Sequence, residues 1–420
     1  MAIEGTVEPR FERVRAAFEE NFDKRGEMGA ALCVYHEGRS VVDLWGGLAD
    51  RARQRPWTID TLAPIDSVSK GLTAICGLML VDSGELDLDA PVAKYWPEFA
   101  AAGKEDLPVR LLFTHQAGLP AVDRWITMAD LESWTPMVEA LQEQTPLWTP
   151  GTAHGYHGVT MGYLVGEVIR RISGLTPGAF LRERISPALG GLEVWIGLPE
   201  AEESRVVAVE RADISPEATV AASTGDERYD AFLAEMAELW ASPWFLAAYA
   251  DPDKRSIEPS LTRSIGARTM GPIEIGEDMN SRRHHAAEVP SVTGIAGAHS
   301  LARLMAALIG EVDGVRLIGP ELTAEVARRY ASGPDQVLRA DTAWGLGFHV
   351  PGGIFMPDFG TGHAFGHAGA NGTLAFADPD RSLALGYLRS LQEWSIPDNR
   401  STPLVEAVYD CLDSATPPVG

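Results

Sequence analysis

A serine and a lysine three residues apart have the residue types and the spacing of a nucleophile and its base. Ser67 and Lys70 open the segment 68–81, which is apolar nearly all the way round and is therefore predicted to be a helix inside the protein. Lys70 is the only charged residue in that segment. Because burial lowers the pKa of a lysine and residues i and i+3 share a helix face, we expect a potential general base beside the Ser67 hydroxyl.

This pair alone is a weak signal. The chain has five lysines, and only Lys70 has a serine three residues upstream. With serine at roughly one position in twenty, such a match arises by chance about one time in four. A capping serine followed by a lysine that reaches the surface would give the same four letters. Other parts of the sequence have to decide between the two interpretations.

Three further segments favour the catalytic interpretation of Ser67 and Lys70. Tyr156-His157-Gly158 precedes an amphipathic helix whose apolar positions run to Ile172 and whose stop signal is Ser173-Gly174. The segment 114–120 reads Thr-His-Gln-Ala-Gly-Leu-Pro. Near the C-terminus, the segment 366–372 reads Gly-His-Ala-Gly-Ala-Asn-Gly, and its glycines allow close backbone approach.

Together these segments give an ordered set of motifs: S-x-x-K at 67–70, a tyrosine motif at 156–158 and H-x-G at 367–369. In order and spacing they resemble the serine β-lactamase and penicillin-binding-protein superfamily. The closest likeness is to its class C-like branch and to the family VIII carboxylesterases. The segment 114–119 is similar to the T-H-x-S-G-L stretch of that branch.

The resemblance implies a role for each motif residue. Ser67 would attack the substrate and form a covalent acyl-enzyme, with Tyr156 and Lys70 acting as base and then as acid to the leaving group. The backbone N–H groups of Ser67 and Ala370 would form the oxyanion hole. A cationic Lys70 amine would lower the pKa of Tyr156, and because the two titrations are coupled, the division of labour between the two residues stays open.

The expected substrate-binding residues are His157, His367 and Gly369. Two positions depart from the lactamase pattern: Gly158 stands where asparagine is usual, and His367 stands where a cationic residue is usual. Both replacements remove groups that would hold the side-chain carbonyl and the carboxylate of a β-lactam. They favour hydrolysis of esters or amides over efficient β-lactam turnover.

The predicted function is a serine carboxylesterase that cleaves esters of small or medium acyl chains. Alternatives on the same residues are an amide, β-lactam or D-amino-acid peptide hydrolase and an acyltransferase. The alternative from another class is a non-catalytic binding protein of this fold, and the intact Ser67, Lys70 and Tyr156 argue against it. The aromatic-rich segment 229–249 would be either core or a wall over the substrate cleft. The physiological substrate, the acyl acceptor and the oligomeric state stay open.

Strands are predicted near both ends of the chain and helices in the middle. Hairpins are expected at 30–45 and 373–388, and a last helix at about 403–412. This order predicts an α+β fold of the β-lactamase/transpeptidase type, in which residues 1–90 and 286–420 build an antiparallel β-sheet flanked by helices. Residues 91–285 would form an inserted, mainly helical lobe, with the active site in the cleft between the lobes.

The composition limits the classes of partner and the cellular compartment that we expect. A net charge of −24 and a pI near 4.8 argue against nucleic acid and membrane surfaces as partners, since both call for a basic footprint. Three widely spaced cysteines are predicted to be free thiols in a reducing compartment. The chain shows neither a signal-peptide pattern nor an apolar run of about 18 residues. We therefore expect a cytoplasmic enzyme that acts on a small-molecule ester.

No metal site and no other cofactor are expected. The paired histidines lack the H-E-x-x-H pattern and the clustered cysteines of zinc sites. His115 is interpreted as a structural hydrogen-bonding residue. The absence of G-x-S-x-G argues against an α/β-hydrolase nucleophile. The paired histidines that lack a zinc pattern are His154 and His157, His284 and His285, and His363 and His367.

Overall fold

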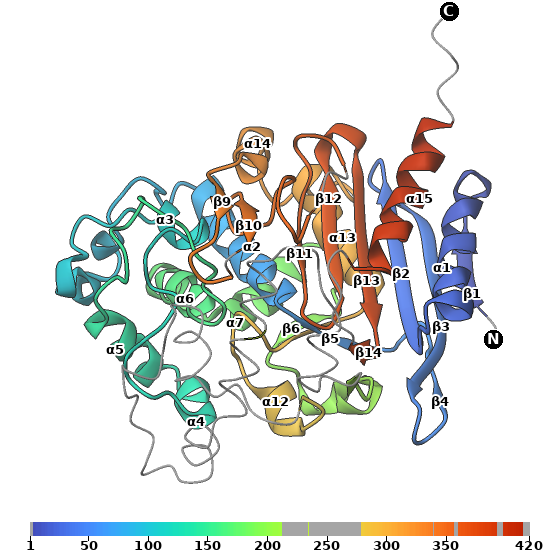
Figure 1. Ribbon diagram of the computed structural model, residues 1–420, viewed down its shortest axis with the longest axis horizontal. Coiled ribbons are helices and arrows are strands. Elements are labelled where there is room, and N and C mark those ends of the chain that lie inside the picture. The colour runs from blue at the N-terminus through green and yellow to red at the C-terminus, as the bar shows by residue number, and fades with distance from the viewer. Residues whose placement is uncertain are drawn as a thin grey trace, which may run out of the picture.

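A seven-stranded antiparallel sheet forms the centre of the part of the chain that the structure describes (Figure 1). The structure, a computed structural model, describes residues 3–211, 234, 279–338, 340–356, 360–392 and 398–414. The strand order is β1, β3, β2, β13, β12, β11, and β4 pairs with β3. The strands are β1 (Ile3–Val7), β2 (Gly29–His36), β3 (Arg39–Asp50), β4 (Arg55–Pro56), β11 (Phe365–Ala368), β12 (Leu374–Asp378) and β13 (Leu383–Arg389).

Both predicted hairpins are confirmed. β2 and β3 meet at a tight turn where Glu37 and Gly38 have positive φ angles of 51° and 77°, as the two central residues of a type I′ hairpin turn require. β12 and β13 are joined by the short segment Pro379–Arg381. In the middle of the sheet β2 pairs with β13, so the two ends of the chain build one sheet. The α+β prediction is confirmed.

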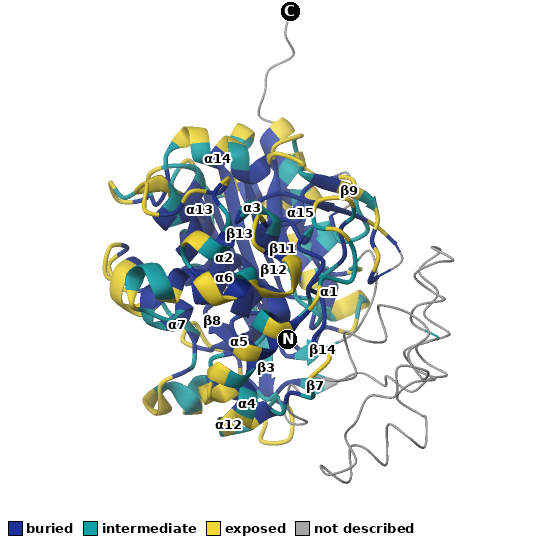
Figure 2. Ribbon diagram, turned by 90° about the vertical axis from the view of Figure 1, so that its left-hand side faces the viewer, coloured by how far each residue is buried: buried dark blue, intermediate teal, exposed yellow. Residues whose placement is uncertain are grey.

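Helices cover both faces of this sheet (Figure 1). Successive residues of β2, such as Leu32 and Cys33, point to opposite faces and join different hydrophobic clusters. Helices α1 (Glu12–Lys24) and α15 (Ser401–Asp413) pack together on the face of Leu32. Helix α13 (Ala298–Ile309) packs on the face of Cys33. Figure 2 shows that the strands between these layers are buried.

The cluster that contains α13 continues into the mainly helical part of the molecule. Its central helix α2 (Val68–Asp82) is buried along almost its whole length and packs against α6 (Thr160–Ser173). A glycine permits close packing here, because a Cβ at Gly77 would lie 2.7 Å from the Phe113 ring. Helix α6 ends at Gly174, which has a left-handed φ of 76°. The helix predicted at 68–81 and the predicted helix stop are confirmed.

Shorter elements complete the described part of the chain. The minor strands form the groups β5 (Ala63–Asp66), β8 (Gly294–Ala296) and β6 (Val194–Ile196); β9 (Ala331–Pro334) and β10 (Asp341–Trp344); and β7 (Glu210–Arg211) and β14 (Leu391–Gln392). The shorter α-helices are α3 (Arg110–Phe113), α4 (Met128–Glu132), α5 (Thr135–Glu143), α7 (Pro177–Phe180), α12 (Arg282–Ala286) and α14 (Pro320–Ala327). The remaining helical turns are Pro9–Phe11, Val92–Lys94, Pro97–Gly103, Leu181–Ile185 and Glu200–Arg205.

The remaining predictions have different outcomes. The three cysteines are free and buried, as predicted. The proposed lobe limits at residues 90 and 286 stay a prediction. The aromatic-rich segment 229–249 lies outside the described residues, apart from residue 234. Among the described residues, no helix combines the length and the apolar character that crossing a membrane demands.

Candidate active site

Ser67 stands where strand β5 runs into helix α2. Asp66, the last residue of β5, has a positive φ of 43°, so the backbone turns sharply just before Ser67. Ser69 donates a hydrogen bond to the Asp66 carbonyl and accepts a 2.8 Å bond from the Gly294 amide of β8. These contacts tie the start of α2 to the small sheet and set the position of Ser67.

Two side chains converge on Ser67 Oγ. Lys70 Nζ lies 3.1 Å away, and the Tyr156 hydroxyl donates a bond of 2.7 Å. Lys70 Nζ also donates a 3.0 Å bond to the Ser291 carbonyl. Lys70 has no exposed surface, whereas Ser67 and Tyr156 keep partial contact with solvent. The structure therefore brings the three expected residues together and leaves the serine accessible.

Burial shifts the pKa values of the two flanking groups in opposite directions. Removal from water lowers the pKa of Lys70 to about 7, and the nearby Asp66 carboxylate offsets only part of this effect. Desolvation raises the pKa of Tyr156 above its usual range. The expectation that Lys70 lowers the pKa of Tyr156 is therefore wrong, because desolvation of the phenol dominates. Near neutral pH a substantial fraction of the Lys70 amine is therefore neutral, beside a phenol that keeps its proton.

A buried carboxylate holds Tyr156, and no motif in the sequence indicated it. Asp335 accepts the backbone N–H of Tyr156 at 3.1 Å. Its other oxygen accepts the Thr342 hydroxyl at 3.1 Å, which in turn accepts the indole N–H of Trp344 at 3.0 Å. The Trp344 ring stacks on Tyr156 at 5.6 Å between centroids and 10° between planes. The segment 335–344 therefore positions both the backbone and the ring of Tyr156.

His157 lies in the second motif, but its ring faces the backbone. Its Nδ1 donates a 2.6 Å bond to the Gly155 carbonyl, and its Nε2 accepts a 3.0 Å bond from the Leu119 amide. The ring is fully buried, and burial lowers its pKa to about 3. His115 Nδ1 accepts the His157 backbone N–H at 3.1 Å, in line with the structural interpretation of His115. Both ring nitrogens of His157 are occupied, so this geometry supports the loop rather than a substrate contact.

The third motif lies on β11, the edge strand of the main sheet. His367 Nδ1 donates a 2.9 Å bond to the Ala368 carbonyl, and within the described part of the chain its Nε2 has no partner. Burial lowers the pKa of His367 to about 3, and the Lys70 amine contributes to the shift. His367 is therefore uncharged at neutral pH and cannot replace the cation of the lactamase motif.

Side-chain hydrogen bonds join the turn after β11 to the strand that leads to Ser67. Asn371 Nδ2 donates a 2.7 Å bond to the Pro64 carbonyl. Thr373 Oγ1 donates a 3.2 Å bond to the Ile65 carbonyl. The turn approaches so closely that a Cβ at Gly369 would lie 2.8 Å from the Ile65 oxygen. Asn371 and Thr373 together form a clamp that holds this turn against β5.

The clamp joins the two backbone segments that carry the expected oxyanion-hole amides. Ser67 follows β5 directly, and Ala370 lies in the clamped turn. Counting only acceptors in the described residues, neither amide donates to a protein group. Donors that are fixed in position and free of protein acceptors are what stabilisation of a developing oxyanion requires.

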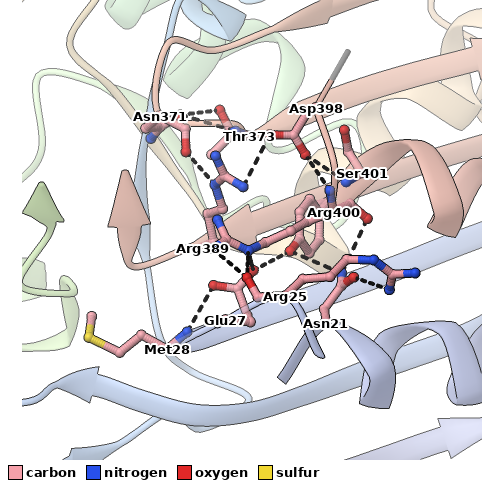
Figure 3. Close-up of polar contacts among 11 residues, drawn as sticks. Asn21, Arg25, Glu27, Met28, Asn371, Thr373, Arg389, Asp398, Arg400 and Ser401 are labelled. Carbon is pink, nitrogen blue, oxygen red and sulfur yellow. Dashed lines mark hydrogen bonds and ion pairs between the residues drawn. The ribbon is translucent and has the colours of Figure 1, made fainter. Parts of the chain in front are cut away.

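A buried arginine supports this turn on its other side (Figure 3). Arg389 Nε donates to the Asn371 carbonyl, and its guanidinium lies 3.2 Å from the Asp398 carboxylate. The Arg389 side chain has no exposed surface. Gly372 has a φ of 82°, and a Cβ there would overlap the guanidinium, so only glycine fits. Sequence patterns gave no signal for Arg389 or Asp398.

Comparison with known proteins shows the family. The chain belongs to the Beta-lactamase family, whose model matches residues 14–407. It is 32% identical over 394 residues to esterase/β-lactamase LipL of Mycobacterium tuberculosis, a match that covers 92% of this chain and 82% of LipL. The predicted family resemblance is confirmed.

Solved structures agree with this assignment. A penicillin-binding-protein homologue from Caulobacter crescentus matches with a TM-score of 0.80 and 37% identity, over 98% of this chain and 100% of that chain. A family VIII carboxylesterase matches with a TM-score of 0.79 and 33% identity, over the same shares. Family and site together define a serine hydrolase of the β-lactamase-like fold.

The clamp makes a testable prediction. Asn371→Ala should lower kcat/KM for a hydrolysed substrate by about 10- to 100-fold, mainly through kcat, because misplaced oxyanion donors weaken transition-state binding. Labelling of the variant by a fluorophosphonate should slow to a similar degree. Thr373→Ser keeps the neighbouring hydroxyl and serves as the matched control. A folded Asn371→Ala protein with parental kcat would show that the clamp does not position the site.

Proposed function

We propose that this protein is a serine carboxylesterase that forms a covalent acyl-enzyme on Ser67. The observation that carries the proposal is the convergence on Ser67 Oγ of a buried amine at 3.1 Å and a phenol at 2.7 Å. An amine with a pKa of about 7 is well matched to general-base catalysis near neutral pH. A phenol with a raised pKa keeps its proton until a leaving group needs it.

These states suggest a sequence of proton transfers. Neutral Lys70 takes the Ser67 proton as Oγ attacks the ester carbonyl, and the amides of Ser67 and Ala370 stabilise the oxyanion. Tyr156 gives its proton to the departing alkoxide and recovers one from protonated Lys70. Water then loses a proton to Lys70 and attacks the acyl group. Ser67 leaves as the alkoxide and takes this proton back from Lys70, which restores the starting state.

The same site supports esters over β-lactams as substrates. His367 offers no positive charge to a lactam carboxylate at neutral pH, because burial keeps its pKa low. Gly158 offers no side-chain amide. The family VIII carboxylesterase among the relatives fits this preference. The name of LipL, esterase/β-lactamase, makes slow β-lactam hydrolysis the second candidate function.

Replacement of the nucleophile tests the proposal first. Ser67→Ala should lower hydrolysis of p-nitrophenyl butyrate by at least about 10⁴-fold, because only the attacking oxygen is removed. A fluorophosphonate should label the parent protein at Ser67, as read by peptide mass spectrometry. Ser83→Ala, at the far end of α2, is the control and should keep parental turnover. Label on another serine would refute the assignment.

The pKa of Lys70 sets the expected pH dependence. Lys70 is protonated below its pKa of about 7 and neutral above it, so kcat/KM should rise with pH through this range. Lys70→Ala and Tyr156→Phe should each lower kcat/KM by about 10²–10⁴-fold, and the double variant should lose little more. Lys94→Ala, remote from the site in sequence, should keep the parental profile. A flat profile from pH 5 to 9 would be inconsistent with a lysine base.

Substrate preference is the third test. The parent protein should show kcat/KM for p-nitrophenyl butyrate at least about 100-fold above that for nitrocefin. A Cβ at Gly158 would meet only the Tyr156 ring, at 3.7 Å, so Gly158→Asn should fold. This variant should raise nitrocefin turnover relative to ester turnover. Comparable turnover of both substrates by the parent would favour the β-lactamase alternative.

A further inference from the structure

Outside the contacts around Ser67, one row of the main sheet gathers residues that are far apart in the sequence. Gly386 on β13 pairs with Cys33 on β2, and Cys33 pairs with Asp43 on β3. Helix α13 lies directly on Gly386, where a Cβ would be 2.8 Å from the Ala298 carbonyl oxygen. Because the helix begins above this row, its second residue, His299, reaches Cys33 and Asp43.

Three side chains with different donor atoms meet at this point. His299 Nδ1 lies 3.0 Å from Asp43 Oδ2 and 3.7 Å from Cys33 Sγ. The three atoms all lie within 4.8 Å of one another. Cys33 is fully buried, whereas the side chains of Asp43 and His299 are 19% and 43% exposed. The group therefore has a buried sulfur at its base and an opening to solvent.

We propose that Cys33, Asp43 and His299 bind a divalent transition-metal ion, for which Zn²⁺ is the best match. Zinc takes thiolate, imidazole and carboxylate ligands. A tetrahedral ion with bonds of about 2.0–2.3 Å holds its ligand atoms about 3.3–3.6 Å apart. The distances from His299 Nδ1 to Asp43 Oδ2 (3.0 Å) and to Cys33 Sγ (3.7 Å) are close to this spacing, and all three atoms lie within 4.8 Å of one another. A thiolate and a carboxylate also balance the two charges of the ion, and water would fill the fourth position.

Tyr35 supplies the outer contact that a ligating histidine needs. Its hydroxyl lies 2.9 Å from His299 Nε2. Without metal, the Nδ1–H group donates a hydrogen bond to Asp43 Oδ2. On binding, the ion takes the Nδ1 lone pair, and the ring proton moves to Nε2 and donates to the Tyr35 oxygen. The S–H bond of Cys33 breaks and its proton goes to solvent, so one proton is released for each ion bound.

Cobalt(II) is the most direct probe of this site. The full chain, treated with EDTA and desalted, should bind one equivalent of Co²⁺ with the strong d–d bands of a tetrahedral site. A thiolate-to-cobalt charge-transfer band in the near ultraviolet should appear in parallel. Zn²⁺ should displace the cobalt and raise the Tm of the protein. A titration without the charge-transfer band would overturn the proposal.

Substitutions identify the ligands. Cys33→Ser should abolish the charge-transfer band, and His299→Gln, at a partly exposed position, should weaken binding by at least about 100-fold. Tyr35→Phe should weaken binding by about 10- to 100-fold and keep the spectrum. Cys76→Ser removes a buried thiol from α2 and is the matched control. A band that survives Cys33→Ser, or disappears in Cys76→Ser, would contradict the assignment.

The metal site and the proposed ester hydrolysis can fail separately. None of the three ligands contacts Ser67, Lys70 or Tyr156 through an observed hydrogen bond within the described residues. The EDTA-treated protein should therefore keep its parental kcat/KM for p-nitrophenyl butyrate. Loss of ester hydrolysis after EDTA treatment, restored by Zn²⁺, would overturn the placement of the metal outside the catalytic group.

Discussion

The burial of one amine, that of Lys70, is the constraint on which the rest of the site depends. Moving its pKa from the usual 10.5 to about 7 corresponds to about 5 kcal/mol against the charged form. A neutral amine can lie at the buried start of this apolar helix without the desolvation penalty of a charge. Its hydrogen bond to the Ser291 carbonyl keeps the nitrogen satisfied in either state. The same burial that would make a structural lysine unfavourable produces a base beside Ser67.

Buried polar groups from distant parts of the chain hold each member of the site. Asp335 fixes the backbone of Tyr156, and Arg389 supports the turn that carries Asn371. Figure 3 shows that the Arg389 contacts extend through Asp398 toward the start of α15. Hydrogen bonds to charged, desolvated groups are stronger than those on the surface and are costly to leave unmade. Unfolding of either the sheet or the helical part of the molecule would therefore break contacts that organise the site.

What the sequence could predict was local. The hairpins, the helix at 68–81 and the i,i+3 pair of Ser67 and Lys70 follow from periodicity and turn residues. Asp335 and Arg389 could not be found, because strand pairing and loop packing bring them to the site and no fixed spacing marks them. The direction of the Tyr156 pKa shift was wrongly predicted for a similar reason. It depends on the balance between a nearby amine and desolvation, and this balance is set by burial in the folded protein. Cys33 and Asp43 likewise meet only through sheet register, and His299 joins them only through the packing of α13.

Titration of Lys70 itself is the most direct test of a base with a lowered pKa beside Ser67. The chain has only five lysines, so protein labelled with ¹³C at lysine Cε gives a simple NMR spectrum in which Lys70→Arg assigns the resonance. Lys104, whose pKa burial lowers to about 8, has to be assigned in the same way. Burial of the Lys70 amine predicts a midpoint near pH 7. A midpoint at the ordinary lysine value of about 10.4 would contradict it, because the amine beside Ser67 would then be charged at neutral pH.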